Sequence, residues 1–299
     1  MKAAFLFPGQ GAQKVAMGKD FYDQFPIAKE TFEEADDRLK RKLSTTIFKG
    51  PEKELTLTSN SQLAIFVTSI AMYRVLASLY SIQPEMCAGL SLGEYTALCA
   101  AGFLDFSECL TLVKHRGEFM HQCCERVEGR MAVVLGLSDE KVQELSIPDQ
   151  LWIANLNCPG QVVISGTVKG VEVGGKRALA LGAKRVLPLN VHGAFHSGLM
   201  SRAQENLSPY IDEAAFKESD TPVVMNVTGK PVREIQTIKE LLKQQVTHSV
   251  LWEEGIHQMK VERFIEFGPG RSLSGLNRKI GITSQMQSID NIEDLKEFE

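Results

Sequence analysis

The sequence lacks an uninterrupted apolar run of the length typical of a signal peptide or a membrane span. Only five apolar residues, 3–7, follow Lys2 before a Pro-Gly pair, which is too short for the apolar region of a secretory signal. The most apolar segment, 63–80, is interrupted by Arg74 and contains no stretch of about 18 consecutive apolar residues. We therefore expect a cytoplasmic protein with no membrane association, in which 63–80 forms a buried helix.

The sequence also lacks an excess of basic charge and any regular cysteine spacing. Its 33 Lys and Arg against 37 Asp and Glu give a formal net charge of −4, so no strong positive field would attract nucleic acid. The cysteines form no C-x-x-C motif and show no metal-ligand spacing with histidine. We expect reduced cysteines, mostly in the core, and no metal site. The six are Cys87, Cys99, Cys109, Cys123, Cys124 and Cys158.

The sequence has 299 residues, of which 43% are hydrophobic. This is enough to form the cores of one large domain and one smaller domain. Most of the chain alternates predicted strands and helices, which favours an α/β fold with a mostly parallel sheet covered by helices. Between 129 and 190 the predicted order is βαββαβ, the ferredoxin-like pattern. We therefore predict a large catalytic domain formed by 1–128 and 191–299, and a small ferredoxin-like domain, 129–190, inserted into it.

A possible nucleophile lies in the stretch CAGLSLGEYT, residues 87–96, which contains G-x-S-x-G centred on Ser91. An apolar run that reads as a buried strand precedes it, and a helical stretch, 92–101, follows. Strand, sharp turn and helix is the context that a nucleophile elbow requires. The alternative is an ordinary strand-to-helix turn in which Ser91 is one small residue among others.

A serine hydroxyl is a weak nucleophile and needs a base within hydrogen-bond reach. His196 is the best candidate, because it lies beside Phe195 in a loop with Gly and Ser, just before a predicted helix and downstream of the elbow. His192 and His248 remain alternatives, and a purely structural role for His196 stays open at this point.

Two further features suit acyl chemistry. An oxyanion hole needs two aimed N–H groups, which the backbone of Leu92 at a helix N-terminus and Gln10 in the loop PGQGAQ, 8–13, would supply. Arg116 lies in the predicted helix 107–124, on a face shared with apolar residues. A cation there needs a partner, because a buried unpaired charge is costly.

Six ordered segments of the chain resemble malonyl-CoA:acyl carrier protein transacylases, the acyltransferases of bacterial type II fatty acid synthesis and of polyketide synthases. The similarity runs from Phe5 to about Ile280. The family fold is a large α/β hydrolase-like domain with an inserted ferredoxin-like domain, in agreement with the βαββαβ pattern. The segments are FPGQGAQ, GLSLGEYTALCAAG, LVKHRGEFM, IANLNCPGQVVISG, AKRVLPLNVHGAFHSGLM and FIEFGPGRSLSGL.

The resemblance implies a ping-pong transfer of malonyl from malonyl-CoA, through a malonyl-serine ester, to the phosphopantetheine thiol of acyl carrier protein. It implies no metal and no redox cofactor, and nothing in the sequence demands more than a monomer. It assigns these roles by position: Ser91 as nucleophile, His196 as base, Gln10 and Leu92 as oxyanion N–H donors, Arg116 as the partner of the malonyl carboxylate, and Phe195 as the residue that favours malonyl over branched substrates.

The chain departs from the family pattern at two positions. Leu90 stands where the elbow usually has histidine, next to the nucleophile. Leu251 stands before Trp252, where the family often has a glutamine thought to orient the catalytic histidine. We expect the reaction to survive the first change with an altered rate or pH profile. At the second position, leucine is harmless if a backbone carbonyl orients His196, which is the role we assign to Leu251, whereas the enzyme should be slow if the family uses the side chain.

Because the chain is itself net negative, an acidic carrier protein would need a local basic patch. Lys184 and Arg185, which precede the segment leading to His196, are the candidates for the mouth of the cleft. Three other functions stay open: an acyl hydrolase on the same fold, a trans-acting polyketide acyltransferase, and a non-catalytic module that binds carrier protein. The charge on Arg116 disfavours a hydrolase of neutral acyl groups.

Overall fold

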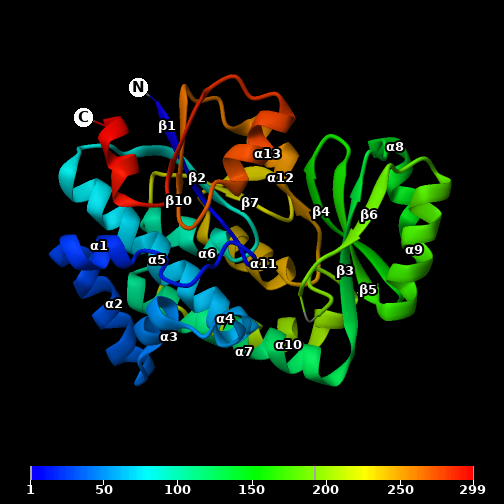
Figure 1. Cartoon of the computed structure of the whole chain (residues 1–299), viewed down its shortest axis with the longest axis horizontal. Coiled ribbons are helices and arrows are strands. Elements are labelled where there is room, and N and C mark those ends of the chain that lie inside the picture. The colour runs from blue at the N-terminus through cyan, green and yellow to red at the C-terminus, as the bar shows by residue number, and fades with distance from the viewer. Residues whose placement is uncertain (1, 192, 299) are drawn as a thin grey trace.

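The computed structural model describes residues 2–191 and 193–298, in which eleven strands form two sheets (Figure 1). The larger sheet has the strand order β11-β10-β1-β2-β7-β8, and every neighbouring pair is parallel except β7 and β8. The predicted mostly parallel sheet is therefore confirmed. Its strands are β1 (Ala3–Phe7), β2 (Pro84–Gly89), β7 (Val223–Met225), β8 (Lys230–Val232), β10 (Arg263–Phe267) and β11 (Gln285–Ile289).

The central position of β1 follows from its sequence, AAFLF. All five residues are buried, and β1 pairs with β2 on one side and β10 on the other. A continuous apolar run with no alternation is typical of a strand whose two faces are both covered by helices. Phe5 and Phe7 contact Phe267 of the adjacent β10, which ties the centre of the sheet to the main core.

Helices surround this sheet, and α5 is the most deeply buried of them. It is long and apolar enough to cross a membrane, but 72% of its most apolar window is buried inside the structure, as the prediction of a buried helix over 63–80 requires. The described helices before residue 129 and after residue 190 are α1 (Lys19–Gln24), α2 (Pro26–Leu39), α3 (Leu43–Lys49), α4 (Glu52–Thr56), α5 (Thr58–Leu79), α6 (Gly93–Ala100), α7 (Phe106–Arg126), α10 (Ser201–Glu213), α11 (Ile235–Gln245), α12 (Trp252–Gln258) and α13 (Ser272–Ile280). The 3₁₀ helices η2 (Gly198–Met200) and η3 (Ile292–Phe298) lie in the same parts of the chain.

The smaller sheet has the order β6-β3-β5-β4-β9 and is antiparallel except where β9 joins β4. Its first four strands, with α8 and α9, follow the predicted order of elements along 129–190, whereas β9 comes from far outside that range. The division into two domains stays a prediction. The elements are β3 (Gly129–Leu135), α8 (Asp139–Val142), η1 (Gln143–Leu145), β4 (Leu151–Cys158), β5 (Gln161–Thr167), α9 (Val168–Ala180), β6 (Arg185–Pro188) and β9 (Val250–Leu251).

The two faces of this smaller sheet have different roles, because successive side chains of a strand point to opposite faces. Val134 and Ile164 face α9 and form part of a separate apolar cluster. Met131, Val133 and Val163 point to the other face and line a cavity. In Figure 1 this sheet stands on the right with α9 on its outer side, so its open face turns toward the larger sheet.

The larger sheet contributes its strand ends to the same region. Gln10 follows β1, Ser91 follows β2 and Asn226 follows β7, so all three lie at the carboxyl ends of neighbouring parallel strands. Ligands of open α/β sheets bind outside this edge, since the loops there converge from several strands. The fold thus brings residues that are far apart in sequence to one cleft between the two sheets.

Candidate active site

Ser91 lies on the sharp turn that the sequence predicted, between β2 and α6. Its φ of 55° is in the left-handed region, which is strained for a residue other than glycine. The flanking glycines are needed for close approach: a Cβ on Gly93 would lie 2.0 Å from the carbonyl oxygen of Phe7, and one on Gly89 would lie 1.9 Å from the Gly93 carbonyl. The G-x-S-x-G spacing therefore presents Ser91 on a tightly packed elbow.

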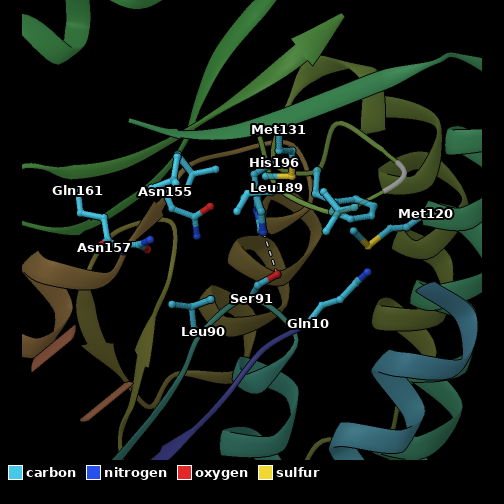
Figure 2. Close-up of a pocket in the computed structure, with 14 residues that line it drawn as sticks. Gln10, Leu90, Ser91, Met120, Met131, Asn155, Asn157, Gln161, Leu189 and His196 are labelled. Atoms are coloured by element: carbon cyan, nitrogen blue, oxygen red, sulfur yellow. Dashed lines mark hydrogen bonds between the residues drawn. The ribbon is translucent and has the colours of Figure 1, made fainter. Parts of the chain in front are cut away.

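His196 is the histidine that reaches this serine. Its Nε2 lies 2.8 Å from Ser91 Oγ, and its Nδ1 lies 2.9 Å from the carbonyl oxygen of Gln245 and 3.1 Å from that of His248 (Figure 2). Because carbonyl oxygens only accept hydrogen bonds, we assign the ring proton to Nδ1. Nε2 is then free to accept the proton of the Ser91 hydroxyl. His248 itself is exposed, and His192 lies outside the described residues.

The electrostatics keep His196 neutral. Burial, and after it the charge of Arg116, lower the pKa of His196 to about 4, although the two carbonyl bonds oppose the shift. A neutral imidazole is the form that accepts a proton.

The prediction that Leu251 orients the histidine is wrong in this structure. Leu251 lies in β9, and its backbone N–H donates to the carbonyl oxygen of Asn226. The side chain of Leu251 lines a different cavity, on the far side of β4. Carbonyls do hold His196, as expected, but they belong to Gln245 and His248 at the end of α11 and the turn after it. The leucine at position 251 therefore does not weaken either of the hydrogen bonds that hold His196 Nδ1.

Arg116 lies beside the serine from the other side. It is 1% exposed, and its Nη2 donates to Ser91 Oγ at 3.0 Å and to Gln245 Oε1 at 2.9 Å, while its Nη1 donates to Gln62 Oε1 at 2.6 Å. These acceptors are neutral, and no carboxylate forms an ion pair with Arg116 in the part of the chain that the structure describes. Burial lowers the pKa of Arg116, yet arginine stays charged in proteins. The site thus contains a buried cation that has hydrogen bonds but no carboxylate in direct contact among the described residues.

Two predicted oxyanion donors also lie at the elbow. Leu92 is the N-cap residue of α6, and Gln10 follows the loop glycine Gly9, whose Cβ would lie only 2.3 Å from the carbonyl oxygen of Leu90. Among the described loop and turn hydrogen bonds, neither the Leu92 nor the Gln10 backbone N–H has a backbone acceptor. Two free N–H groups next to a serine are the arrangement that stabilises an oxyanion.

A cavity of about 280 Å³ opens above Ser91 (Figure 2). Phe195, which is buried, forms part of its wall with the apolar residues of the smaller sheet, and Leu90 lines its base. Asn155, Asn157 and Gln161 lie on the opposite side from Gln10 in the same view. The complete lining is Gln10, Leu90, Ser91, Met120, Met131, Val133, Asn155, Asn157, Gln161, Val163, Leu189, Val191, Phe195 and His196.

A second cavity of about 560 Å³ shares Gln10, Leu189 and Val191 with the first, so the two adjoin. The predicted docking residues lie away from both. Arg185 begins β6, roughly 13 Å along the strand from Leu189 at about 3.3 Å per residue. Lys184 precedes it, and both are exposed. They lie at the far end of β6 from the cavity, although Arg185 shares a strand face with Leu189.

Sequence reasoning missed three buried polar residues of the site. Gln245, Asn226 and Glu94 are each at most 4% exposed, and each hydrogen-bonds the Ser91 backbone or a residue that does. The one available signal was Glu94, a charge in the otherwise apolar stretch that follows the elbow. Among the described residues no three His, Cys, Asp or Glu side chains gather as metal ligands.

Comparison with known proteins agrees with this geometry. Residues 4–269 match the family model described as acyl transferase domain. The malonyl CoA-acyl carrier protein transacylase of Bacillus subtilis is 46% identical over 287 residues, covering 93% of this chain and 90% of that protein. The crystal structure of an acyl carrier protein S-malonyltransferase from Vibrio cholerae has a TM-score of 0.95 and 36% identity, with 100% of both chains covered.

A further solved structure contains a type II PKS acyl-carrier protein in complex with its malonyl-transacylase. It matches with a TM-score of 0.94 and 36% identity, covering 99% of this chain and 98% of that one. The family model spans most of the chain, and the similarity in sequence and in structure extends over nearly all of it. This chain therefore belongs to the acyl transferase family, and in its cleft both a histidine and an arginine contact the serine of the elbow.

Proposed function

We propose that this protein transfers a malonyl group from malonyl-CoA to the phosphopantetheine thiol of acyl carrier protein, and so supplies fatty acid biosynthesis in the cytoplasm. The single observation that carries the proposal is the contact of Ser91 Oγ with both His196 Nε2, at 2.8 Å, and Arg116 Nη2, at 3.0 Å. One partner suits a base, and the other suits a carboxylate attached to an acyl group on that oxygen.

In the first half-reaction, His196 Nε2 takes the hydroxyl proton as Ser91 Oγ attacks the thioester carbon of malonyl-CoA. The carbonyl oxygen becomes an oxyanion that the N–H groups of Gln10 and Leu92 stabilise. When the intermediate collapses, the C–S bond breaks and His196 returns its proton to the thiolate, so that CoA leaves as a thiol. The product is a malonyl ester of Ser91.

The second half-reaction reverses this sequence with a different thiol. His196 takes the proton of the carrier's phosphopantetheine thiol, the thiolate attacks the ester carbon, and Ser91 leaves with the proton returned by His196. Both thiols carry the same pantetheine arm, so one channel serves both partners. The second cavity, which adjoins the first, supports this role. The chemistry uses only these side chains and substrates, and the enzyme acts as a monomer.

Selectivity for malonyl is expected from charge and shape together. The guanidinium of Arg116 offers a planar fork that matches a carboxylate. Phe195 beside the base fills the wall of a cavity of only about 280 Å³, which leaves little room for a branch at the α-carbon. A trans-acting polyketide acyltransferase would use the same site, and the similarity to a transacylase solved with a type II PKS carrier keeps that alternative open.

The proposal is tested by incubating the protein with labelled malonyl-CoA, with and without acyl carrier protein. A malonyl transferase forms malonyl-serine without the carrier and malonyl-carrier with it. Free malonate as the main product would instead indicate a hydrolase, and no labelled protein in either arm would indicate a non-catalytic module. Replacing the fatty acid carrier by a polyketide carrier in the same assay separates the two pathways.

The rate of Ser91 malonylation is expected to stay nearly constant as the pH falls from 7 to 5. His196 must be neutral to accept a proton, and its pKa of about 4 keeps it neutral over this range. The expected change is less than about twofold, whereas a histidine that titrates near 6.5 would lose roughly 30-fold. Intact-mass measurement of acyl-enzyme formation at several pH values checks this, with circular dichroism confirming that the protein is folded. A decline centred near pH 6.5 would contradict it.

Replacing both Lys184 and Arg185 by glutamate is expected to raise the KM for carrier protein by roughly 3- to 10-fold, and more at low salt. Acylation by malonyl-CoA should not change, because these residues lie away from the cavity. The matched control reverses Lys176 and Arg177, which are exposed on the outer helix α9. Equal damage to both half-reactions, or an equal effect of the control, would refute carrier docking at the start of β6.

A further inference from the structure

Glu94 is a completely buried carboxylate in the first turn of α6, three residues after the nucleophile. Its Oε1 accepts the backbone N–H of Asn226 at 2.5 Å, and its Oε2 accepts the side-chain amide of Gln245 at 2.6 Å. No ion pair to a lysine or an arginine forms at Glu94 within the described part of the chain. Both oxygens therefore receive hydrogen bonds, and neither faces a counter-charge directly.

The two residues that Glu94 binds both hold the backbone of Ser91. Asn226 Oδ1 accepts the Ser91 N–H at 2.7 Å, and Gln245 Nε2 donates to the Ser91 carbonyl at 2.8 Å. Since Ser91 has a φ of 55°, its peptide groups need partners outside the regular strand and helix. Glu94 is thus connected to the elbow through two residues: Asn226, which binds the Ser91 N–H, and Gln245, which binds the Ser91 carbonyl.

The contacts of Gln245 fix which way its amide points. The Ser91 carbonyl can only accept and the Arg116 guanidinium can only donate, so the NH₂ group of Gln245 faces that carbonyl and Glu94 Oε2, and the amide oxygen faces Arg116 Nη2 at 2.9 Å. Turning the amide over would place its oxygen against two acceptors and its NH₂ group against a guanidinium. Glu94 Oε2, a second acceptor beside the Ser91 carbonyl, therefore reinforces the polarity of the chain of bonds that ends at Arg116.

We propose that Glu94 is a positioning residue: through the Gln245 amide it holds Arg116 and the Ser91 backbone in the geometry that malonyl transfer requires. This inference rests on the function proposed above. It explains why a carboxylate is kept in a fully buried place where an apolar side chain would pack at lower cost. Burial raises the pKa of Glu94 to about 8, and the bonds from Asn226 and Gln245 and the charge of Arg116 oppose that rise.

The test is Glu94→Gln, which preserves size and removes one acceptor. If its oxygen still accepts from Asn226, its NH₂ group meets the NH₂ group of Gln245, and Gln245 must turn over or move away from its contacts with Ser91 and Arg116. We expect the single-turnover rate of Ser91 malonylation to fall about 100-fold, because a small misplacement of a reacting group lowers a rate by about this factor. Acylation by acetyl-CoA should fall less, because acetyl has no carboxylate for Arg116 to hold. The ratio of the two rates is the readout that a merely structural residue would leave unchanged.

The matched control is Glu266→Gln. Glu266 is also completely buried, and its oxygens also accept N–H groups, those of Leu273 and Ser274 at the start of α13, away from the serine. We expect this control to lower the unfolding midpoint and to leave the malonyl-to-acetyl ratio at the wild-type value. An unchanged ratio in Glu94→Gln, with rates lowered only as far as folded protein is lost, would overturn the proposal.

A second variant covers the case in which Glu94→Gln does not fold. Gln245→Met removes the side-chain amide but keeps the backbone carbonyl that holds His196, and it should lower the malonyl-to-acetyl ratio in the same direction. The double variant should lose no more than the larger single loss, because both changes break one connected network. A wild-type ratio in Gln245→Met, or multiplying losses, would refute it. If wild-type protein forms no malonyl-serine, the proposed function fails instead.

Discussion

Replacement of Ser91 by alanine is expected to abolish the covalent malonyl-enzyme and to lower transfer to carrier protein by about 10⁴-fold or more. The hydroxyl is the atom on which the site converges, since it contacts both His196 and Arg116. Alanine removes that oxygen while the elbow remains, because Asn226 and Gln245 hold the backbone of residue 91 rather than its side chain. The measurement is intact mass after mixing with malonyl-CoA.

A suitable control is Ser165→Ala. The hydroxyl of Ser165 is buried in β5 and has no hydrogen-bond partner among the described residues, so its removal breaks no bond. The control should acquire one malonyl group at the wild-type rate. A malonyl adduct on Ser91→Ala protein would mean that another side chain carries the acyl group, and the nucleophile proposed here would be wrong.

Replacement of Arg116 by alanine is expected to remove the preference for malonyl over acetyl. The guanidinium is desolvated and has no carboxylate in direct contact among the described residues, so a malonyl carboxylate on Ser91 would be the first to reach it. Losing such a charged contact costs about 2–4 kcal/mol, or roughly 30- to 1,000-fold in kcat/KM for malonyl-CoA. Acetyl-CoA has no carboxylate, and its methyl group faces an unpaired cation in the wild type. Its kcat/KM should stay the same or rise.

The ratio of kcat/KM for the two substrates should therefore fall toward one in Arg116→Ala. The control is Arg74→Ala. Arg74 lies over the ring of Phe106, as Arg116 lies over the ring of Tyr95, but it makes no contact with the serine. This variant should change the unfolding midpoint and not the ratio. Equal losses for malonyl and acetyl in Arg116→Ala would show that Arg116 acts structurally, through Gln62 and Gln245. Arg116→Lys should recover part of the preference, because it restores the charge without the planar fork.

The sequence was sufficient for the elements whose cause is local. The all-apolar run 3–7 predicted the buried strand β1, the pattern around G-x-S-x-G predicted strand, turn and helix, and the buried helix at 63–80 was predicted from composition and length. Each depends on residues close together in the chain, where periodicity and steric limits act directly. The resemblance to a family then gave roles to Ser91, His196 and Arg116, and the structure brings these three into contact.

Tertiary structure alone decided the contacts that support them. Gln245 is more than 150 residues from Ser91, yet it touches the serine carbonyl, Arg116, His196 and Glu94, because the end of α11 packs against the elbow. Leu251 was predicted for the histidine because of its place next to a tryptophan, but β9 turns it toward another cavity. Hydrogen-bond partners across such separations follow from how strands and helices pack in space, and no local pattern of residues encodes them. The sequence by itself therefore determined the turn that carries Ser91 and predicted Ser91 as the nucleophile, while packing determined which polar groups hold His196, Arg116 and the serine backbone in place.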